Sequence, residues 1–347
     1  MQPESVELVA LAAVALLLVL VLAPAPPSRP RLIATGGTGL AGTILVAAAP
    51  TFDLALLALL ATGIAQAAID GRRPFATRLR APAVAVALLA LAAVFARVEG
   101  PEIVHRFAAV GLATGLAVAL GVLPFLHPFD PEELVTASPV AWLAYVGPVV
   151  AAVIVADAHG ILTVDAGEGF GAMLIALGLL NMAGGSIAAW RAENGASAWR
   201  YSFVADWGLA LCGFGLGLPD GRRAALLVMF TLLWCRLPLY VASRQSLREH
   251  VVADRPVNLL VAGALAGSAP FAGFAARVLL LRAATQLNWP LALVLVLGML
   301  LWLPASLRLG RSLGVPSGRQ AVGVAIVLAV NVAGGLYPLP LLAAARV

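Results

Sequence analysis

The chain has 347 residues, of which 62% are hydrophobic and 11% charged, with a formal net charge of +5 and a mean hydropathy of +0.99. This balance excludes a soluble globular domain, and the repeated long apolar runs predict an all-α polytopic membrane protein in a lipid bilayer. All basic residues are arginine. In a membrane chain these residues chiefly set orientation, so the basic character does not indicate nucleic-acid binding.

Twelve spans are predicted, at residues 5–24, 32–49, 52–69, 81–97, 107–125, 138–156, 168–190, 201–218, 221–243, 257–283, 286–307 and 321–343. Glu4 and Glu7 stand where a secretory signal would be positive, so the first run is interpreted as a retained helix. With the N-terminus outside, the inner loops hold fourteen arginines and the outer side six. We therefore expect a bacterial inner-membrane protein with both termini outside.

One apolar run, at residues 260–284, is interrupted by Gly267 and Pro270 and again by Gly273. Proline removes a backbone donor and glycine weakens a helix, so two half-helices joined within the membrane are predicted. Broken helices of this kind are where transporters hold ions and substrates.

A second interrupted run, at 111–131, contains Pro124 and ends at Pro131. It lies five spans before the first, and this spacing predicts inverted five-helix repeats, each with one broken helix. The predicted parts are a helix and loop at 1–31, repeats at 32–156 (spans two to six) and 168–308 (spans seven to eleven), and a C-terminal helix at 321–347.

Three charged residues lie inside predicted spans and away from the span ends, namely Asp206, Arg236 and Arg277. A carboxylate in lipid is expensive, so Asp206 must face the bundle interior, water or a basic partner. Pairing with an arginine would make it a structural ion pair, and an ion-conducting polar axis is the functional alternative. Arg236 lies either in the core or close enough to the inner end to extend out of the membrane. Arginine does not release its proton in proteins, so neither arginine can carry one.

The loop after the second break holds His127, Asp130, Glu132 and Glu133. His127 is interpreted as a capping or packing group, with a proton relay as the alternative. The carboxylates form an acidic patch that is either solvated, which we expect, or paired with a neighbouring subunit's arginines. Asn331 is expected to be a helix-contact residue.

Other chemistries leave no motif in the sequence. There is no phosphate-binding glycine loop, CxxC pair, HExxH or GxSxG. Cys212 and Cys235 lie in apolar runs and are expected to be core residues. We therefore expect no metal and no cofactor in this chain, and any redox chemistry would belong to partner subunits.

Three stretches carry a family resemblance. LAGSAPFAGFAARVLLLRAA, PFLHPFDPEELVTASPVAWL and AAWRAENGASAWRYSFVADWGLALCGFGLG resemble the broken helix, the loop and the following helix pair of the antiporter-like proton-channel subunits. These subunits occur in respiratory complex I, Mrp antiporters and membrane-bound hydrogenases. The resemblance covers about residues 107–310 and implies an ion-translocating membrane subunit that works with other membrane subunits. It also implies that this chain is shortened at its N-terminus.

The chain departs from that family where the resemblance implies proton-carrying residues. The predicted third span has no carboxylate in its interior, since Asp53 lies at its outer end and Asp70 just beyond its inner end, and the fifth and sixth spans have no basic residue. Arg277 stands where the family usually has lysine or glutamate. These departures predict a lost N-terminal half-channel and a residual polar axis in the C-terminal half. The alternatives are a purely structural or sealing subunit and, ranked last, an independent secondary transporter.

Overall fold

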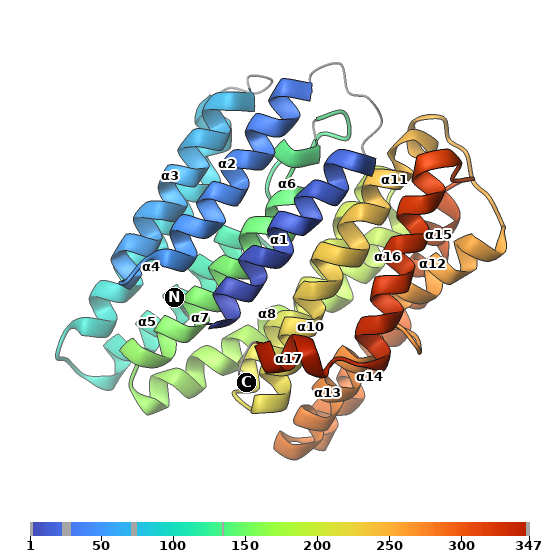
Figure 1. Ribbon diagram of the computed structural model, residues 1–347. Helices are drawn as coiled ribbons and strands as arrows, with labels where there is room; N and C mark the ends of the chain where they lie inside the picture. Colours follow the sequence, from blue (N-terminus) through green and yellow to red (C-terminus); the bar gives the residue numbers. More distant parts are fainter. Residues whose placement is uncertain (1–2, 23–28, 71–74, 134, 345–347) are drawn as a thin grey trace. The chain divides into compact units, whose positions relative to one another are not determined.

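The computed structural model describes residues 3–22, 29–70, 75–133 and 135–344, and every regular element in these ranges is a helix (Figure 1). Arg72, Arg73 and Arg346, which the orientation prediction counts, lie outside the described residues. Contacts divide the chain into two compact units, residues 1–12 with 28–176 and residues 13–27 with 177–347. The predicted repeat boundaries remain a prediction.

The first unit is built from helices before residue 177. They are α1 (Pro3–Leu22, shared with the second unit), α2 (Arg29–Ala48), α3 (Phe52–Asp70), α4 (Phe75–Arg97), α5 (Glu102–Leu120), η1 (Val135–Ala137), α6 (Pro139–Ala141), η2 (Trp142–Val146), α7 (Gly147–Ile161) and the first part of α8 (Val164–Arg191).

The second unit contains the rest of the helices. They are the remainder of α8, then α9 (Gly195–Gly215), α10 (Pro219–Thr231), η3 (Leu232–Arg236), α11 (Leu237–Arg248), α12 (Pro256–Ala266), α13 (Ala272–Leu287), α14 (Trp289–Leu301), α15 (Leu303–Ser312), α16 (Gly318–Leu336) and α17 (Leu339–Ala344).

Within the described residues, nine helical stretches are long and apolar enough to cross a membrane. They coincide with nine of the predicted spans. The other three, at 5–24, 201–218 and 257–283, coincide with α1, α9 and the α12–α13 pair. The structure confirms the prediction of an all-α polytopic membrane fold.

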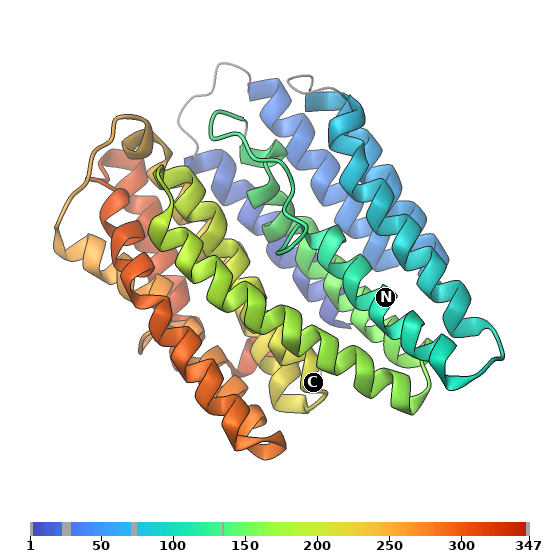
Figure 2. The ribbon, with the colours of Figure 1, turned by 180° about the vertical axis from the view of Figure 1, so that it is seen from behind.

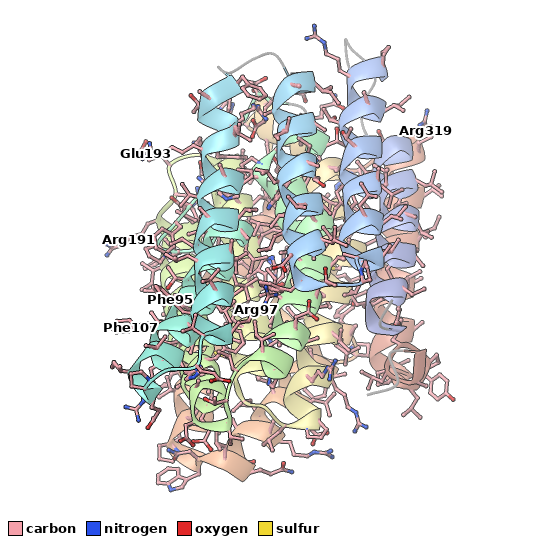
Figure 3. The ribbon with its side chains drawn as sticks, turned by 90° about the vertical axis from the view of Figure 1, so that its left-hand side faces the viewer. Phe95, Arg97, Phe107, Arg191, Glu193 and Arg319 are labelled. Atoms are coloured by element: carbon pink, nitrogen blue, oxygen red, sulfur yellow. The ribbon has the colours of Figure 1, made fainter. Side chains whose placement is uncertain are left out.

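Helices α2 to α5 pack against their chain neighbours in the first unit, as the two views from opposite sides show (Figures 1 and 2). Small residues allow these helices to approach closely: a Cβ on Gly111 would lie 2.8 Å from that of Ala92. The outer side of α4 and α5 is apolar, and Phe95 and Phe107 are 38% and 62% exposed there (Figure 3). An apolar exposed surface is what a helix facing lipid requires.

Each unit has one almost wholly buried span. In the first unit it is 139–161, with 89% of its apolar window buried, and in the second it is 219–248, with 94% buried. Both contain a turn of π-helix, η2 and η3 respectively. A π-turn adds one residue to a helical turn and so changes which side chains face a neighbour. Trp142 begins one of these turns and Arg236 ends the other.

Both predicted interruptions begin at a glycine that ends a helix. α5 stops at Leu120 before Gly121 (φ 74°), and α12 stops at Ala266 before Gly267 (φ 62°). These left-handed backbone angles favour glycine because it lacks a Cβ. The breaks then differ: α13 restarts at Ala272, whereas residues 121–133 contain no helix.

The prediction of a second interruption at Gly273 is wrong. This residue lies in the first turn of α13. A Cβ there would be 2.9 Å from the Cα of Gly267, so Gly273 is required for close packing against the break.

The substitution Gly121→Ala tests how the first break is built. The left-handed angle costs alanine about 1 kcal/mol, and a Cβ at this position would lie 2.7 Å from the His127 ring. Displacing that ring removes a hydrogen bond worth about 1 kcal/mol more. We expect a larger loss of thermal stability in detergent than for Gly217→Ala, where φ is 65° and no atom lies within 4 Å. Equal losses would mean that His127 does not hold the break.

Candidate functional site

The charged residues predicted in the second unit come together around the break between α12 and α13. Asp206 lies in the middle of α9, whose start is fixed by Asn194, since the Asn194 side chain accepts a 2.7 Å hydrogen bond from the amide of Ser197. Arg236 ends the π-turn in the neighbouring buried span. Its Nε donates to Oδ2 of Asp206 at 2.5 Å. The two side chains are 3% and 8% exposed, so this is a buried ion pair.

Arg236 also binds the broken helix. Its Nη2 donates to the carbonyl of Leu265 at 3.2 Å, and the same carbonyl accepts a 2.7 Å bond from the indole of Trp302. The guanidinium lies over the Trp302 ring, 4.9 Å from its centroid. The last carbonyls of a helix have no partner within it, and in a membrane there is no bulk water to supply one. Arg236 and Trp302 supply these partners, so Arg236 lies in the core and does not extend to the inner end.

Arg277 lies on the other side of the break, in the second turn of α13. Its guanidinium carbon would be 2.7 Å from a Cβ on Gly267, so the side chain covers the glycine that ends α12. Together with Asp206 and Arg236 it lines a small cavity. The structure thus brings all three charged residues to one place, with Gly267 and Gly273 in the same lining.

Asn331 of α16 binds the backbone on the α13 side of the break. Its Oδ1 accepts a 3.1 Å hydrogen bond from the amide of Ala272, the first residue of α13. The side chain is fully buried. The prediction of a helix-contact role is confirmed, and the contact is made with the backbone of the break.

His127 and Trp142 play the matching part at the first break. His127 Nε2 lies 2.8 Å from the carbonyl of Val118, and the indole of Trp142 donates to the carbonyl of Ala119 at 2.7 Å. Both carbonyls belong to the last turn of α5. His127 therefore caps this helix, in line with the capping interpretation, and Pro124 lies between the helix end and the histidine.

The acidic patch of the following loop is divided in two. Glu132 is exposed, and its amide bonds to Oδ1 of Asp130 at 2.9 Å. Glu133 is buried and accepts a 3.1 Å hydrogen bond from Nη2 of Arg78 in α4. The expectation of a solvated patch was wrong for Glu133, because this side chain is buried and paired with Arg78 of the same chain. Pro131, half-buried beside this loop, makes no helix break of its own.

His127 and Glu133 line a cavity of about 70 Å³ in the first unit, and its other polar lining residues are Gln66, Thr77, Arg78 and Ser138. The third span adds no carboxylate to it. Asp53 at the start of α3 pairs with Arg97 at the end of α4, and both side chains are largely exposed. These charged groups of the first unit therefore lie near the break or at helix ends.

Sequence reasoning missed the two tryptophans and Arg78. Each tryptophan belongs to the span that follows a break, Trp142 after the first and Trp302 after the second. An indole N–H buried in an apolar run needs an acceptor, and a broken helix nearby offers one. That shared position was the signal available in the sequence.

The substitution Arg236→Met tests the buried pair. It leaves Asp206 charged and without its partner in the core, which costs about 3–5 kcal/mol. The matched control is Arg97→Met, which removes the exposed partner of Asp53 and should cost less than about 1 kcal/mol. Unfolding in denaturing detergent measures both losses. Similar small losses for the two variants would contradict a charged, buried Asp206–Arg236 pair.

The structure is similar to chains of solved membrane complexes. No protein-family model matches the sequence, and no curated protein matches it. The fold matches a chain of the Mrp complex from Dietzia sp. (TM-score 0.81, 14% identity, 99% of this chain and 44% of that one). It matches a chain of respiratory complex I from Thermus thermophilus with a TM-score of 0.74 and 19% identity over 99% of this chain and 86% of that one.

A third match is a chain of the membrane-bound sulfane sulfur reductase, an archaeal respiratory membrane complex. Its TM-score is 0.77 and its identity 18%, over 97% of this chain and 65% of that one. This chain therefore spans less than half of the matched Mrp chain and about two thirds of the reductase chain. At these identities the likeness concerns the fold alone, which this chain shares with chains of three membrane complexes.

Proposed function

We propose that this chain is an antiporter-like subunit in the membrane part of a complex I-type ion-translocating redox complex. In this role its N-terminal proton half-channel is lost and a polar axis remains in the C-terminal half. The fold likeness to chains of the Mrp complex, of respiratory complex I and of the archaeal reductase supports the general kind of protein. Its partners would be other membrane subunits within the bilayer, and any redox cofactor would be held by those partners.

The cluster of Asp206, Arg236 and Arg277 at the break is the observation that carries the proposal. Buried charge inside a membrane span is expensive and is found where ions or protons pass. Within the described residues, Asp206 and Arg236 are the buried charged side chains located in the middle of spans. Their position at an interrupted helix is where transporters place such groups.

The first unit supports loss of its half-channel. At its break, His127 and Trp142 bond to the last carbonyls of α5. The Trp142 indole donates a hydrogen bond but does not take up or release a proton. α3 has no charged residue between Asp53 and Asp70, and the spans 107–120 and 139–156 contain no basic residue. A proton crossing this unit would therefore lack a chain of titratable groups.

The two breaks also support an inverted repeat. Residues 121–125 and 267–271 share the pattern Gly-x-x-Pro-Phe, and both glycines end a helix in the left-handed conformation. In each case the carbonyl two residues before the glycine accepts a hydrogen bond from a tryptophan indole of the following span. Matching bonds at matching positions favour a duplicated unit. We propose the inverted arrangement on this basis. From the distribution of arginines between the loops, we also propose a bacterial inner-membrane location with both termini outside.

A purely structural subunit is the second candidate, and one observation favours it. Arg236 is already used to neutralise Asp206 and to cap α12. Arginine stays protonated, so a chain of groups that includes it cannot hand a proton along by releasing its own. The cluster would then hold the break together while a neighbouring subunit moves the ion.

Purification in mild detergent with identification of the co-purifying subunits tests the subunit role. Proton pumping by that complex, with Asp206→Asn and Arg277→Ala in this chain, then tests conduction. We expect partner subunits to appear, the complex to assemble, and pumping to fall severalfold, because both substitutions change the charge of the polar axis. Asp220→Asn is the control: Asp220 pairs with Arg282 and Arg223 at the end of the same unit, away from the break.

Each other outcome selects a different conclusion. If the complex assembles and both variants pump as well as the control, the chain is a structural spacer. If the chain purifies alone and stable, it does not act as a subunit.

A further inference from the structure

We propose that the cavity between Arg236 and Arg277 binds a small monovalent inorganic anion such as chloride. The cavity is lined by Asp206, Thr231, Cys235, Arg236, Gly267 and Arg277 together with apolar side chains. Anion binding here does not depend on whether the subunit moves protons.

The charges that line the cavity do not cancel. Two guanidinium groups face one carboxylate, which leaves one excess positive charge in the membrane-spanning part of the unit. The other four carboxylates of residues 177–347 lie in loops or at helix ends, at Glu193, Asp220, Glu249 and Asp254. Arginine cannot lower the cost by losing its proton. A bound anion would restore neutrality.

Arg236 provides a donor for this anion. Its Nε is bonded to Asp206 and its Nη2 to the Leu265 carbonyl. Its Nη1 is buried and has no hydrogen-bond partner among the described residues. A buried donor on a charged group costs free energy when no acceptor is present, which identifies Nη1 as the atom that lacks a ligand.

Arg277 supplies the second cationic group. It lies against Gly267, and no hydrogen bond or ion pair joins its guanidinium to another of the described residues. The N-terminal end of α13 adds a partial positive charge on the same side, since Gly273 in its first turn also lines the cavity. The nearby carbonyl of Leu265 already accepts two hydrogen bonds and is not available to either arginine's remaining donors.

The size of the cavity limits the ligand. Its volume is about 20 Å³, which suits one water molecule or one monatomic ion. A phosphate, or the carboxylate side chain of a partner subunit, would require the helices to separate. The occupant that fits both the space and the charge is therefore a halide ion.

Thermal unfolding of the purified full-length chain, in its complex where partners are retained, tests this inference. Potassium chloride replaces potassium gluconate at constant ionic strength, so only the anion changes. We expect the melting temperature to rise by roughly 2–4 °C and to saturate, as a single site does. Arg277→Gln should abolish the rise, because the remaining Asp206–Arg236 pair is neutral.

Arg282→Gln is the matched control, since Arg282 lies on the same helix and binds Asp220 at the exposed end. It should keep the chloride response. Bromide provides a second measurement that needs no variant: anomalous scattering from crystals grown in bromide should give a peak beside Nη1 of Arg236. A flat chloride titration, an unchanged response in Arg277→Gln, or density for water only beside Nη1 would overturn the proposal.

Discussion

A helix that ends inside a membrane leaves carbonyl groups without partners, and the rest of this structure depends on how those groups are satisfied. In water such an end would be hydrated, but in the bilayer each unpaired group costs several kcal/mol. The protein meets the requirement with side chains from other spans. His127 and Trp142 bind the end of α5, and Arg236 and Trp302 bind the end of α12. Two of these side chains, Trp142 and Arg236, belong to the π-turns of the two buried spans.

The choice of arginine at the second break has a cost and a benefit. A guanidinium has five donors in a fixed plane, so Arg236 can bond Asp206, cap α12 and stack on Trp302 at once. A lysine could make the ion pair but not all three contacts. The cost is a permanent charge in the core. Where a titratable group would adjust to its neighbours by changing protonation, this cluster must be neutralised by another charge.

Hydropathy was sufficient to predict the spans, because helices of this length in lipid must be apolar throughout. Glycine and proline were sufficient to predict the break at Gly267–Pro270, since both act on the local backbone. The same local logic was wrong at Gly273, where packing against Gly267 decides the outcome. The partners of Glu133 and Asp206 depend on which face of a distant helix turns inward. A π-turn shifts that face by about 100°, and no hydropathy pattern reveals it. The site residues were therefore predictable as a set, but their contacts were not.

The geometry of the break between α12 and α13 depends on contacts with α16. Asn331 supplies the acceptor for the first amide of α13, and Gly335 lies so close to the backbone of residues 270–272 that no side chain fits between them. This helix lies after residue 308, where the predicted second repeat ends. The five-helix unit is thus not self-sufficient in this protein. Because α16 follows the break in the sequence, the interrupted helix can reach its final geometry only after this later helix has been synthesised and has packed against it.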